Sequence, residues 1–156
     1  WLDRVKKRNR ILIPEQGAER GNLTFVDDLA RMIADALTVK NHRVTYNAVT
    51  YPMNSLREKL DTMARVMGNA PEFVSLSAEQ MKENDVRQPR DFPCSFGKEF
   101  LAFDITKVKN DFQFEFTPYE ETIRRCAEYQ DSLGWLSCSK GMSIETEDQL
   151  LSKYGN

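Results

Sequence analysis

The sequence predicts an α/β fold in which short strands alternate with amphipathic helices. Short apolar runs, bounded by proline, glycine or polar residues, are too brief for helices and are typical of strands. Between these runs, apolar residues recur at the spacing of an amphipathic helix, often behind an N-cap signature. Strands and helices that alternate along the chain, rather than forming separate blocks, favour an α/β protein.

The first part of the chain is predicted to be helix, then two extended pieces, then helix. Trp1–Lys7 has the pattern of a helix without an N-cap residue or an initiator methionine before it, so we expect a fragment of a longer protein. Ile11–Pro14 and Asn22–Val26 are predicted to be extended. A helix follows, with Asp27 and Asp28 capping its first turn, where carboxylates complement the helix dipole. Its apolar residues fall at helical spacing: Val26, Leu29, Ile33 and Leu37.

The middle of the chain repeats this alternation. Arg43–Val49 has the composition of a strand. Ser55–Glu58 forms a capping box at the start of an amphipathic helix that ends at Gly68. Glu72–Leu76 is predicted to be a strand, and Ser77–Gln80 is a second capping box before a brief helix.

The last part contains the longest predicted loop. Asn84–Gly97 carries two prolines and shows no periodicity, and a loop of this length in a compact domain is more often functional than idle. Ile105–Asn110 is predicted to be a helical turn. Thr117–Glu120 supplies an N-cap, a proline at the first helical position and a glutamate for a long helix to about Gln130. Glu145–Lys153 is weakly amphipathic.

Composition excludes some classes of function. The 22 basic and 24 acidic side chains give a net charge of −2, which disfavours nucleic acid or an anionic membrane as a partner. No run approaches the roughly 18 apolar residues of a membrane span, so we expect a cytoplasmic protein. The 3 cysteines are widely spaced and favour neither disulfides nor zinc. The single histidine, His42, is interpreted as a turn residue, and no metal site is predicted.

The chain lacks the motifs of a cofactor site. None of the 7 glycines falls in a G-x-G-x-x-G pattern, and none of the 5 tyrosines is followed by lysine four residues later. The sequence therefore predicts neither dinucleotide-binding nor catalytic residues within this chain.

Motifs along the chain resemble the extended short-chain dehydrogenase/reductase family, in its NAD-dependent epimerase/dehydratase branch. Thr24–Ala30 is similar to the family's F-V-x-V-D-D-L-A element, and Ser55–Leu60 follows at the usual distance. Phe103–Lys109 and Phe114–Glu121 look like the family's ending, so the resemblance runs from Trp1 to about Tyr129. It implies the C-terminal portion of a Rossmann-like fold, residues 1–131. Residues 132–156 are expected to be a C-terminal extension that is family-specific or partly disordered.

The resemblance also implies that the two halves of the whole protein have different functions. In such proteins the N-terminal half binds NAD(P) and carries the catalytic Tyr-x-x-x-Lys pair, while the C-terminal half binds a nucleotide-sugar. This chain would then be the substrate-binding portion of an isomerase or oxidoreductase, inactive alone, with the N-terminal Rossmann half in the same gene or in a separate chain. A homodimer is compatible with this reading, and the substrate could be another phosphate-bearing small molecule.

Four residues are predicted to bind that substrate. Arg20 and Asn22 lie before the Phe25 motif, and Arg87 and Arg90 lie in the proline-bearing loop, where the family often reads R-P-G-D. A guanidinium suits this role because it stays charged and can hold two phosphate oxygens. The alternative interpretation is that these arginines are ordinary solvated loop charges.

A second resemblance leads to a different function. Arg90–Pro93 and Glu99–Asp104 are also similar to the chloroplast stem-loop RNA-binding proteins, which share the fold. The basic run Arg4–Arg10 could then contribute to an RNA-binding module, although the acidic net charge disfavours this alternative.

Overall fold

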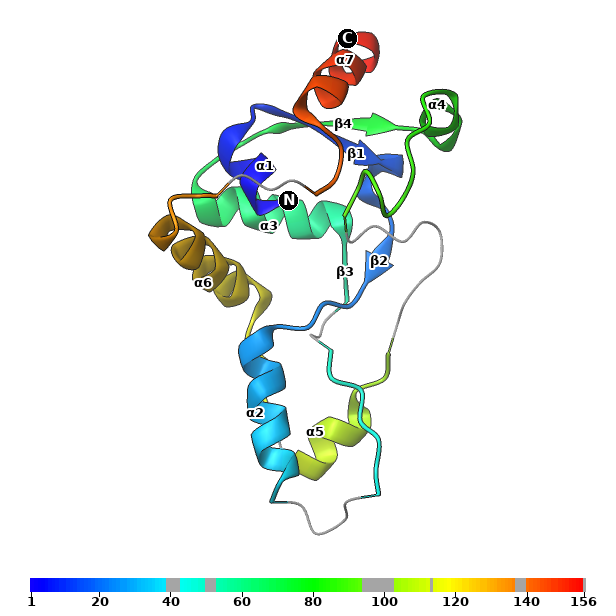
Figure 1. The fold of residues 1–156 in the computed structure, drawn as a ribbon. Helices are drawn as coiled ribbons and strands as arrows, with labels where there is room; N and C mark the ends of the chain where they lie inside the picture. The colour runs from blue at the N-terminus through cyan, green and yellow to red at the C-terminus, as the bar shows by residue number, and fades with distance from the viewer. Residues whose placement is uncertain (39–42, 50–52, 94–102, 113, 137–139, 156) are drawn as a thin grey trace.

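The computed structural model describes residues 1–38, 43–49, 53–93, 103–112, 114–136 and 140–155 (Figure 1). At its centre is a parallel strand pair, in which β1 (Arg10–Pro14) lies beside β4 (Glu72–Leu76). Parallel strands need a long crossover connection, and the chain between them supplies it with several elements. The predicted α/β class is confirmed, with a small sheet.

His42, Cys94 and Cys138 lie outside the described residues.

Helices cover both faces of the strand pair. α1 (Leu2–Lys7) and α3 (Leu56–Met67) pack against one face, and α7 (Ile144–Tyr154) packs against the other (Figure 1). Successive side chains of a strand point to opposite faces, so Ile11 joins the α1 and α3 cluster while Leu12 joins that of α7. The two faces of one short strand therefore anchor two apolar clusters.

A second body of helices lies beyond the sheet. α2 (Val26–Ala36) and α5 (Thr106–Phe112) lie side by side there, and α6 (Tyr119–Ser132) packs against α3 (Figure 1). The short antiparallel pair of β2 (Arg20–Gly21) and β3 (Asn54–Ser55) lies between this body and the sheet. The second body has its own buried cluster of Met32, Ile105, Val108 and Phe114.

Locally encoded elements lie where the sequence predicts them. In the capping box of α3, the Ser55 hydroxyl accepts from the Glu58 backbone N–H at 3.1 Å. The helix ends at Gly68, whose φ of 67° is the left-handed conformation expected of a C-cap glycine. α4 (Ala78–Glu83) begins with the predicted capping box at Ser77. The strand at 72–76, the turn of α5 and the segment of α7 are likewise confirmed.

The predicted strand Arg43–Val49 is wrong, because the segment pairs with no strand among the residues that the structure describes. Its backbone instead bonds to side chains: the Thr24 hydroxyl donates to the Ala48 carbonyl at 2.7 Å, and the Lys107 ammonium donates to the Thr45 carbonyl at 3.2 Å. The extended piece predicted at Asn22–Val26 also shifts. The residues that pair are those of β2, just upstream, and Val26 already belongs to α2.

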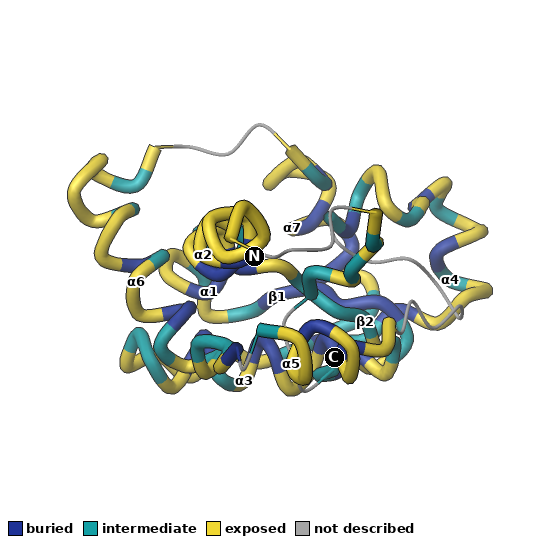
Figure 2. The backbone as a smooth tube through the Cα atoms, turned by 90° about the horizontal axis from the view of Figure 1, so that it is seen from below, coloured by how far each residue is buried: buried dark blue, intermediate teal, exposed yellow. Residues whose placement is uncertain are grey.

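The apolar stripe of α2 points outward. Val26, Ile33 and Leu37 are 67%, 57% and 78% exposed, whereas the buried residues of the helix are Asp28 and Met32. Figure 2 shows α2 as exposed along most of its length. Periodicity located the helix correctly, but it does not say which face meets the core.

In place of the predicted caps of α2 and α6, Asp28 of α2 contacts the segment that precedes α6. Asp28 is buried, and its carboxylate accepts the Thr117 hydroxyl at 2.7 Å and the Thr117 backbone N–H at 3.0 Å. Thr117 is therefore not the N-cap of α6, which is Pro118, and Asp28 does not cap α2. The carboxylate ties the start of one helix to the segment preceding the other.

Candidate functional site

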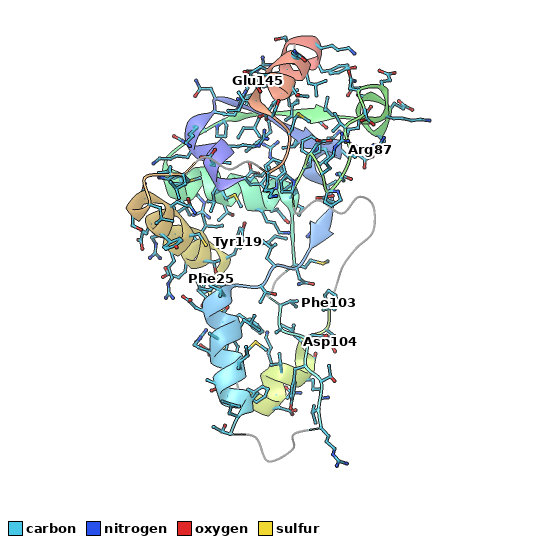
Figure 3. All side chains as sticks on the ribbon, in the orientation of Figure 1. Phe25, Arg87, Phe103, Asp104, Tyr119 and Glu145 are labelled. Atoms are coloured by element: carbon cyan, nitrogen blue, oxygen red, sulfur yellow. The ribbon has the colours of Figure 1, made fainter. Side chains whose placement is uncertain are left out.

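The predicted binding residues follow the carboxyl ends of the parallel strands. Arg20 and Asn22 lie on the segment after β1, and Arg87 and Arg90 lie on the loop that follows β4 and α4. In open α/β sheets, ligands bind in the crevice beyond the carboxyl ends of the strands. Figure 3 shows Arg87 near these strand ends. This end of the sheet is the candidate site.

Hydrogen bonds join the two segments at this end. The Gln16 backbone N–H donates to the Ser75 hydroxyl of β4 at 2.7 Å. The Gln88 side-chain amide donates to the Glu19 carboxylate at 3.5 Å, the long limit of such a bond. The first bond ties residues 15–22 to β4, and the second ties them to residues 84–93, so the two segments are in contact although they are far apart in sequence.

The first segment passes closely over the start of α3. After the turn η1 (Glu15–Gly17), a Cβ on Gly17 would lie 2.9 Å from the Arg57 backbone nitrogen, and the residue has a φ of +68°, so the position requires glycine. The Glu19 carbonyl accepts from the Leu56 backbone N–H at 2.9 Å. The Lys59 ammonium donates to the Gly21 carbonyl at 2.7 Å. α3 thus fixes the backbone from which Arg20 projects.

Arg20 and Asn22 make different contacts. The Arg20 guanidinium donates to the Met53 carbonyl at 3.3 Å and lies 3.4 Å from the Glu58 carboxylate, with 44% of its side chain exposed. Both contacts are long, so Arg20 can turn toward an anion at small cost. The Asn22 side-chain oxygen accepts from the Phe103 backbone N–H at 3.1 Å, which joins this segment to the start of the family-like ending.

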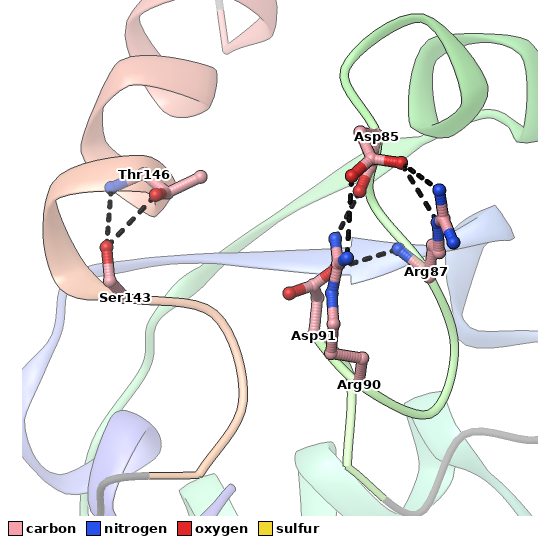
Figure 4. Close-up of polar contacts among 6 residues, drawn as sticks. All are labelled: Asp85, Arg87, Arg90, Asp91, Ser143 and Thr146. Atoms are coloured by element: carbon pink, nitrogen blue, oxygen red, sulfur yellow. Dashed lines mark hydrogen bonds and ion pairs between the residues drawn. The ribbon is translucent and has the colours of Figure 1, made fainter.

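The second segment holds its arginines in a charge network (Figure 4). Arg87 donates through Nε and Nη2 to Oδ1 of Asp85, at 2.9 and 2.6 Å. Arg90 donates to the Asp91 carboxylate at 2.8 and 3.0 Å and to the Asp85 carboxylate at 3.4 Å. The Asp91 carboxylate also accepts from the Arg87 backbone N–H at 2.8 Å. The network closes the loop on itself.

The same network sets the electrostatics of the site. Hydrogen bonds from Arg87 and, secondarily, Arg90 hold the pKa of Asp85 below its ordinary value. The bond to Asp91 raises the pKa of Arg90. Two guanidiniums and two carboxylates carry no net charge, so an incoming phosphate has to compete with Asp85 and Asp91 for the same N–H groups.

Lys59 and Gln88 are site residues that the sequence predictions missed. Lys59 is only 9% exposed and supports the Arg20 segment from beneath. The sequence feature that could have identified Lys59 is its position. It lies one turn after Leu56 and one turn before Met63, on the buried face of α3. The contact that Gln88 makes with Glu19 joins segments far apart in sequence, so it is visible only in three dimensions.

Two hollows lie away from this end of the sheet. One, of about 410 Å³, is at the amino end of β1 and is lined by Arg8, Arg10 and Asp148 among others. Arg8 pairs there with Asp148, and Arg10 pairs with Glu72 at 2.8 Å. The other, of about 510 Å³, lies between α2 and the region of Phe112 and Phe114. The predicted binding residues line neither hollow.

Within the described part of the chain, no group of His, Cys, Asp or Glu side chains is arranged to hold a metal ion. None of the helices in the described ranges combines the length and the apolar character needed to cross a membrane.

Comparisons with known proteins define the fold. Searches against protein-family profiles and curated protein sequences gave no match. Among solved structures, the chain is similar to RMD from Pseudomonas aeruginosa complexed with NADPH, with a TM-score of 0.62 and 12% sequence identity. The likeness covers 85% of this chain and 40% of that chain. The chain therefore has the fold of part of a protein that binds NADPH, and it spans less than half the length of that protein.

Proposed function

We propose that this chain is the substrate-binding portion of an NAD(P)-dependent nucleotide-sugar epimerase, dehydratase or reductase of the extended short-chain dehydrogenase/reductase family. The observation that carries the proposal is the surface at the carboxyl ends of β1 and β4, where both segments with predicted phosphate-binding arginines meet. The likeness to part of an NADPH complex supports it. The cofactor would be bound mainly by an N-terminal Rossmann half, with the whole protein in the cytoplasm.

In this proposal the site binds a diphosphate. Arg20 and Arg87 would contact its oxygens, because their side chains are 44% and 69% exposed. Arg90 would act mainly by closing the loop, since its side chain bonds to both Asp85 and Asp91, whereas the Arg87 side chain bonds to Asp85. Asn22 would hold the Arg20 segment to Phe103. No catalytic group is assigned, and the chain alone would be inactive.

Calorimetric titration of the 156-residue chain with UDP-glucose and GDP-mannose tests this assignment. Replacing Arg20 or Arg87 by alanine is expected to raise the Kd about tenfold, the usual effect of losing one charge-assisted contact. Asp85→Asn is expected to lower the Kd several-fold, because it removes the carboxylate that competes with phosphate while keeping a hydrogen-bond acceptor.

Arg65→Ala is the matched control. Arg65 is 60% exposed against 69% for Arg87, pairs with one carboxylate, Glu120, at 2.7 Å, and lies on α3 away from the loop. It should leave the Kd unchanged. Failure of both nucleotide-sugars to bind, or weaker binding by Asp85→Asn, would show that the arginines are ordinary loop charges.

The RNA-binding alternative stays a prediction. The basic run that could serve it is largely paired with acids: Arg4 and Arg8 with Glu147, and Arg10 with Glu72. Those pairs reduce the positive potential that phosphate binding with counterion release requires, and so they favour the nucleotide-sugar proposal over RNA binding.

A further inference from the structure

The loop that carries Arg87 and Arg90, residues 84–93, is anchored to the core at two points. Val86 and Phe92 are 7% and 2% exposed, and both pack into the apolar cluster that α7 forms against the strand pair. The two arginines lie between these anchors. The position of their guanidinium groups therefore depends on what holds the ends of the loop in place.

The segment before α7 lies directly against the far end of this loop. The Met142 backbone N–H donates to the Asp91 carbonyl at 2.9 Å. A Cβ on Gly141 would lie 3.1 Å from the Pro93 ring and 3.2 Å from the Asp91 carbonyl oxygen, and Gly141 has a φ of +88°. Any larger residue would have to displace the loop by a few tenths of an ångström. α7 then begins at its N-cap, Ser143 (Figure 4).

The start of α1 holds the same end of the loop. The Trp1 indole N–H donates to the Pro93 carbonyl at 2.6 Å, and the indole ring stacks on Phe92 with the ring centroids 6.1 Å apart. Arg4 of α1 donates to the Met142 carbonyl at 2.6 Å, which joins the two supports to each other. The end of the loop is therefore held between α1 and the segment before α7.

Asp91 connects this support to the arginines. Its carbonyl is the group that Met142 binds, and its carboxylate accepts from the Arg87 backbone N–H and from the Arg90 guanidinium, both at 2.8 Å. The Asp91 backbone N–H also donates to the Arg87 carbonyl at 2.8 Å. Both backbone groups of Arg87 are thus bonded to one residue, and that residue is held by the segment before α7.

We infer that Gly141, Met142 and Trp1 are positioning residues for the candidate site: they hold Asp91 and, through it, Arg87 where a phosphate would bind. The inference rests on the proposed function for its ligand, and it gives the C-terminal part of the chain a role in the site. A guanidinium that is held in place binds more tightly, because less conformational freedom is lost when the ligand binds.

Gly141→Ala should raise the Kd for UDP-glucose or GDP-mannose about threefold, a small effect for residues that are coupled through one network. Gly134→Ala is the matched control. Gly134 also has a positive φ, of +69°, but a Cβ there would meet nothing within 4 Å. Both variants incur the backbone cost of a positive φ, so only the contact with the loop differs, and Gly134→Ala should leave the Kd unchanged.

A double-mutant cycle separates positioning from a general loss of stability. If Gly141 acts through Arg87, Gly141→Ala should cause no further rise in Kd when Arg87 is already alanine. Trp1→Phe is a second variant that does not depend on the glycine variant folding. It keeps the stacking but removes the N–H that binds Pro93, and it should also raise the Kd. Its control is Trp135→Phe, because the Trp135 indole binds Asp131 instead.

Amide hydrogen exchange of residues 84–93 tests the support without any ligand. The Arg87 and Asp91 amides should exchange faster in Gly141→Ala and Trp1→Phe than in the two controls. Equal exchange in all four variants would overturn the inference, and so would an undiminished effect of Gly141→Ala on the Kd in the Arg87→Ala background. If the native chain bound neither nucleotide-sugar, the proposed function would fail, and the exchange rates alone would decide whether these residues hold the loop.

Discussion

Replacing Glu147 by alanine is expected to destabilise the fold by about 3 kcal/mol, at the lower end of the cost of breaking a buried ion pair. The Glu147 side chain, on α7, is fully buried and pairs with Arg4 of α1. Its carboxylate pairs with Arg4, lies 3.4 Å from Arg8, and accepts the Leu12 backbone N–H at 3.0 Å. Leu12 lies in β1, and this N–H points away from β4, so Glu147 satisfies the outer edge of the strand.

Two contacts keep the cost at that lower end. Arg4 retains its bond to the Met142 carbonyl at 2.6 Å, and Arg8 retains its pair with Asp148. The Leu12 N–H is left without its acceptor, which alone costs about 1 to 3 kcal/mol when buried. Glu147→Gln should be milder, because the amide oxygen can still accept from Leu12.

Equilibrium unfolding in urea measures this difference, provided that the m-value is unchanged. The control is Glu145→Ala, an exposed glutamate in the first turn of the same helix, which should change the midpoint far less. If Glu147→Ala and Glu145→Ala were equally mild, the buried carboxylate would not be holding α7 to β1.

Two other carboxylates that accept backbone N–H groups, those of Asp28 and Glu58, are also expected to stabilise the fold. Asp28→Ala should lower the free energy of unfolding by about 2 kcal/mol, because it leaves the Thr117 N–H and hydroxyl without their shared acceptor. No change in the urea unfolding midpoint would refute the contact between α2 and the Thr117 segment that precedes α6. The Ser55 backbone N–H holds the pKa of Glu58 below its ordinary value of 4.5. A lowered folded-state pKa gives stability that is present above pH 4.5 and lost as the pH falls through the folded value, so Glu58→Gln should flatten the acid limb of stability. The box of α4 uses Gln80, which does not titrate, so Gln80→Ala should leave the pH dependence unchanged.

The features that the sequence predicts best are those that neighbouring residues decide. Both capping boxes, the Gly68 terminus and the strand at 72–76 depend on residues a few positions apart, and all lie where expected. Arg43–Val49 has a strand's composition but pairs with no strand among the described residues, and a strand's backbone needs a partner. The periodicity of α2 located the helix, but its orientation depends on α5 and the Thr117 segment, which are distant in sequence.

In the candidate site, too, some features follow from the local sequence and others depend on tertiary contacts. Its arginines could be predicted to lie on loops, and those loops do follow the strands of a parallel pair. Their pairing with Asp85 and Asp91, and the Gln88 contact to Glu19, depend on how the backbone folds over itself.

Titrating the 156-residue chain with NADPH and with a nucleotide-sugar under the same conditions tests the central claim most directly. The chain has no G-x-G-x-x-G motif, so saturable binding of UDP-glucose or GDP-mannose without stoichiometric binding of NADPH is the expected result. Stoichiometric NADPH binding by this chain alone would contradict the assignment of substrate binding to this portion and cofactor binding to another.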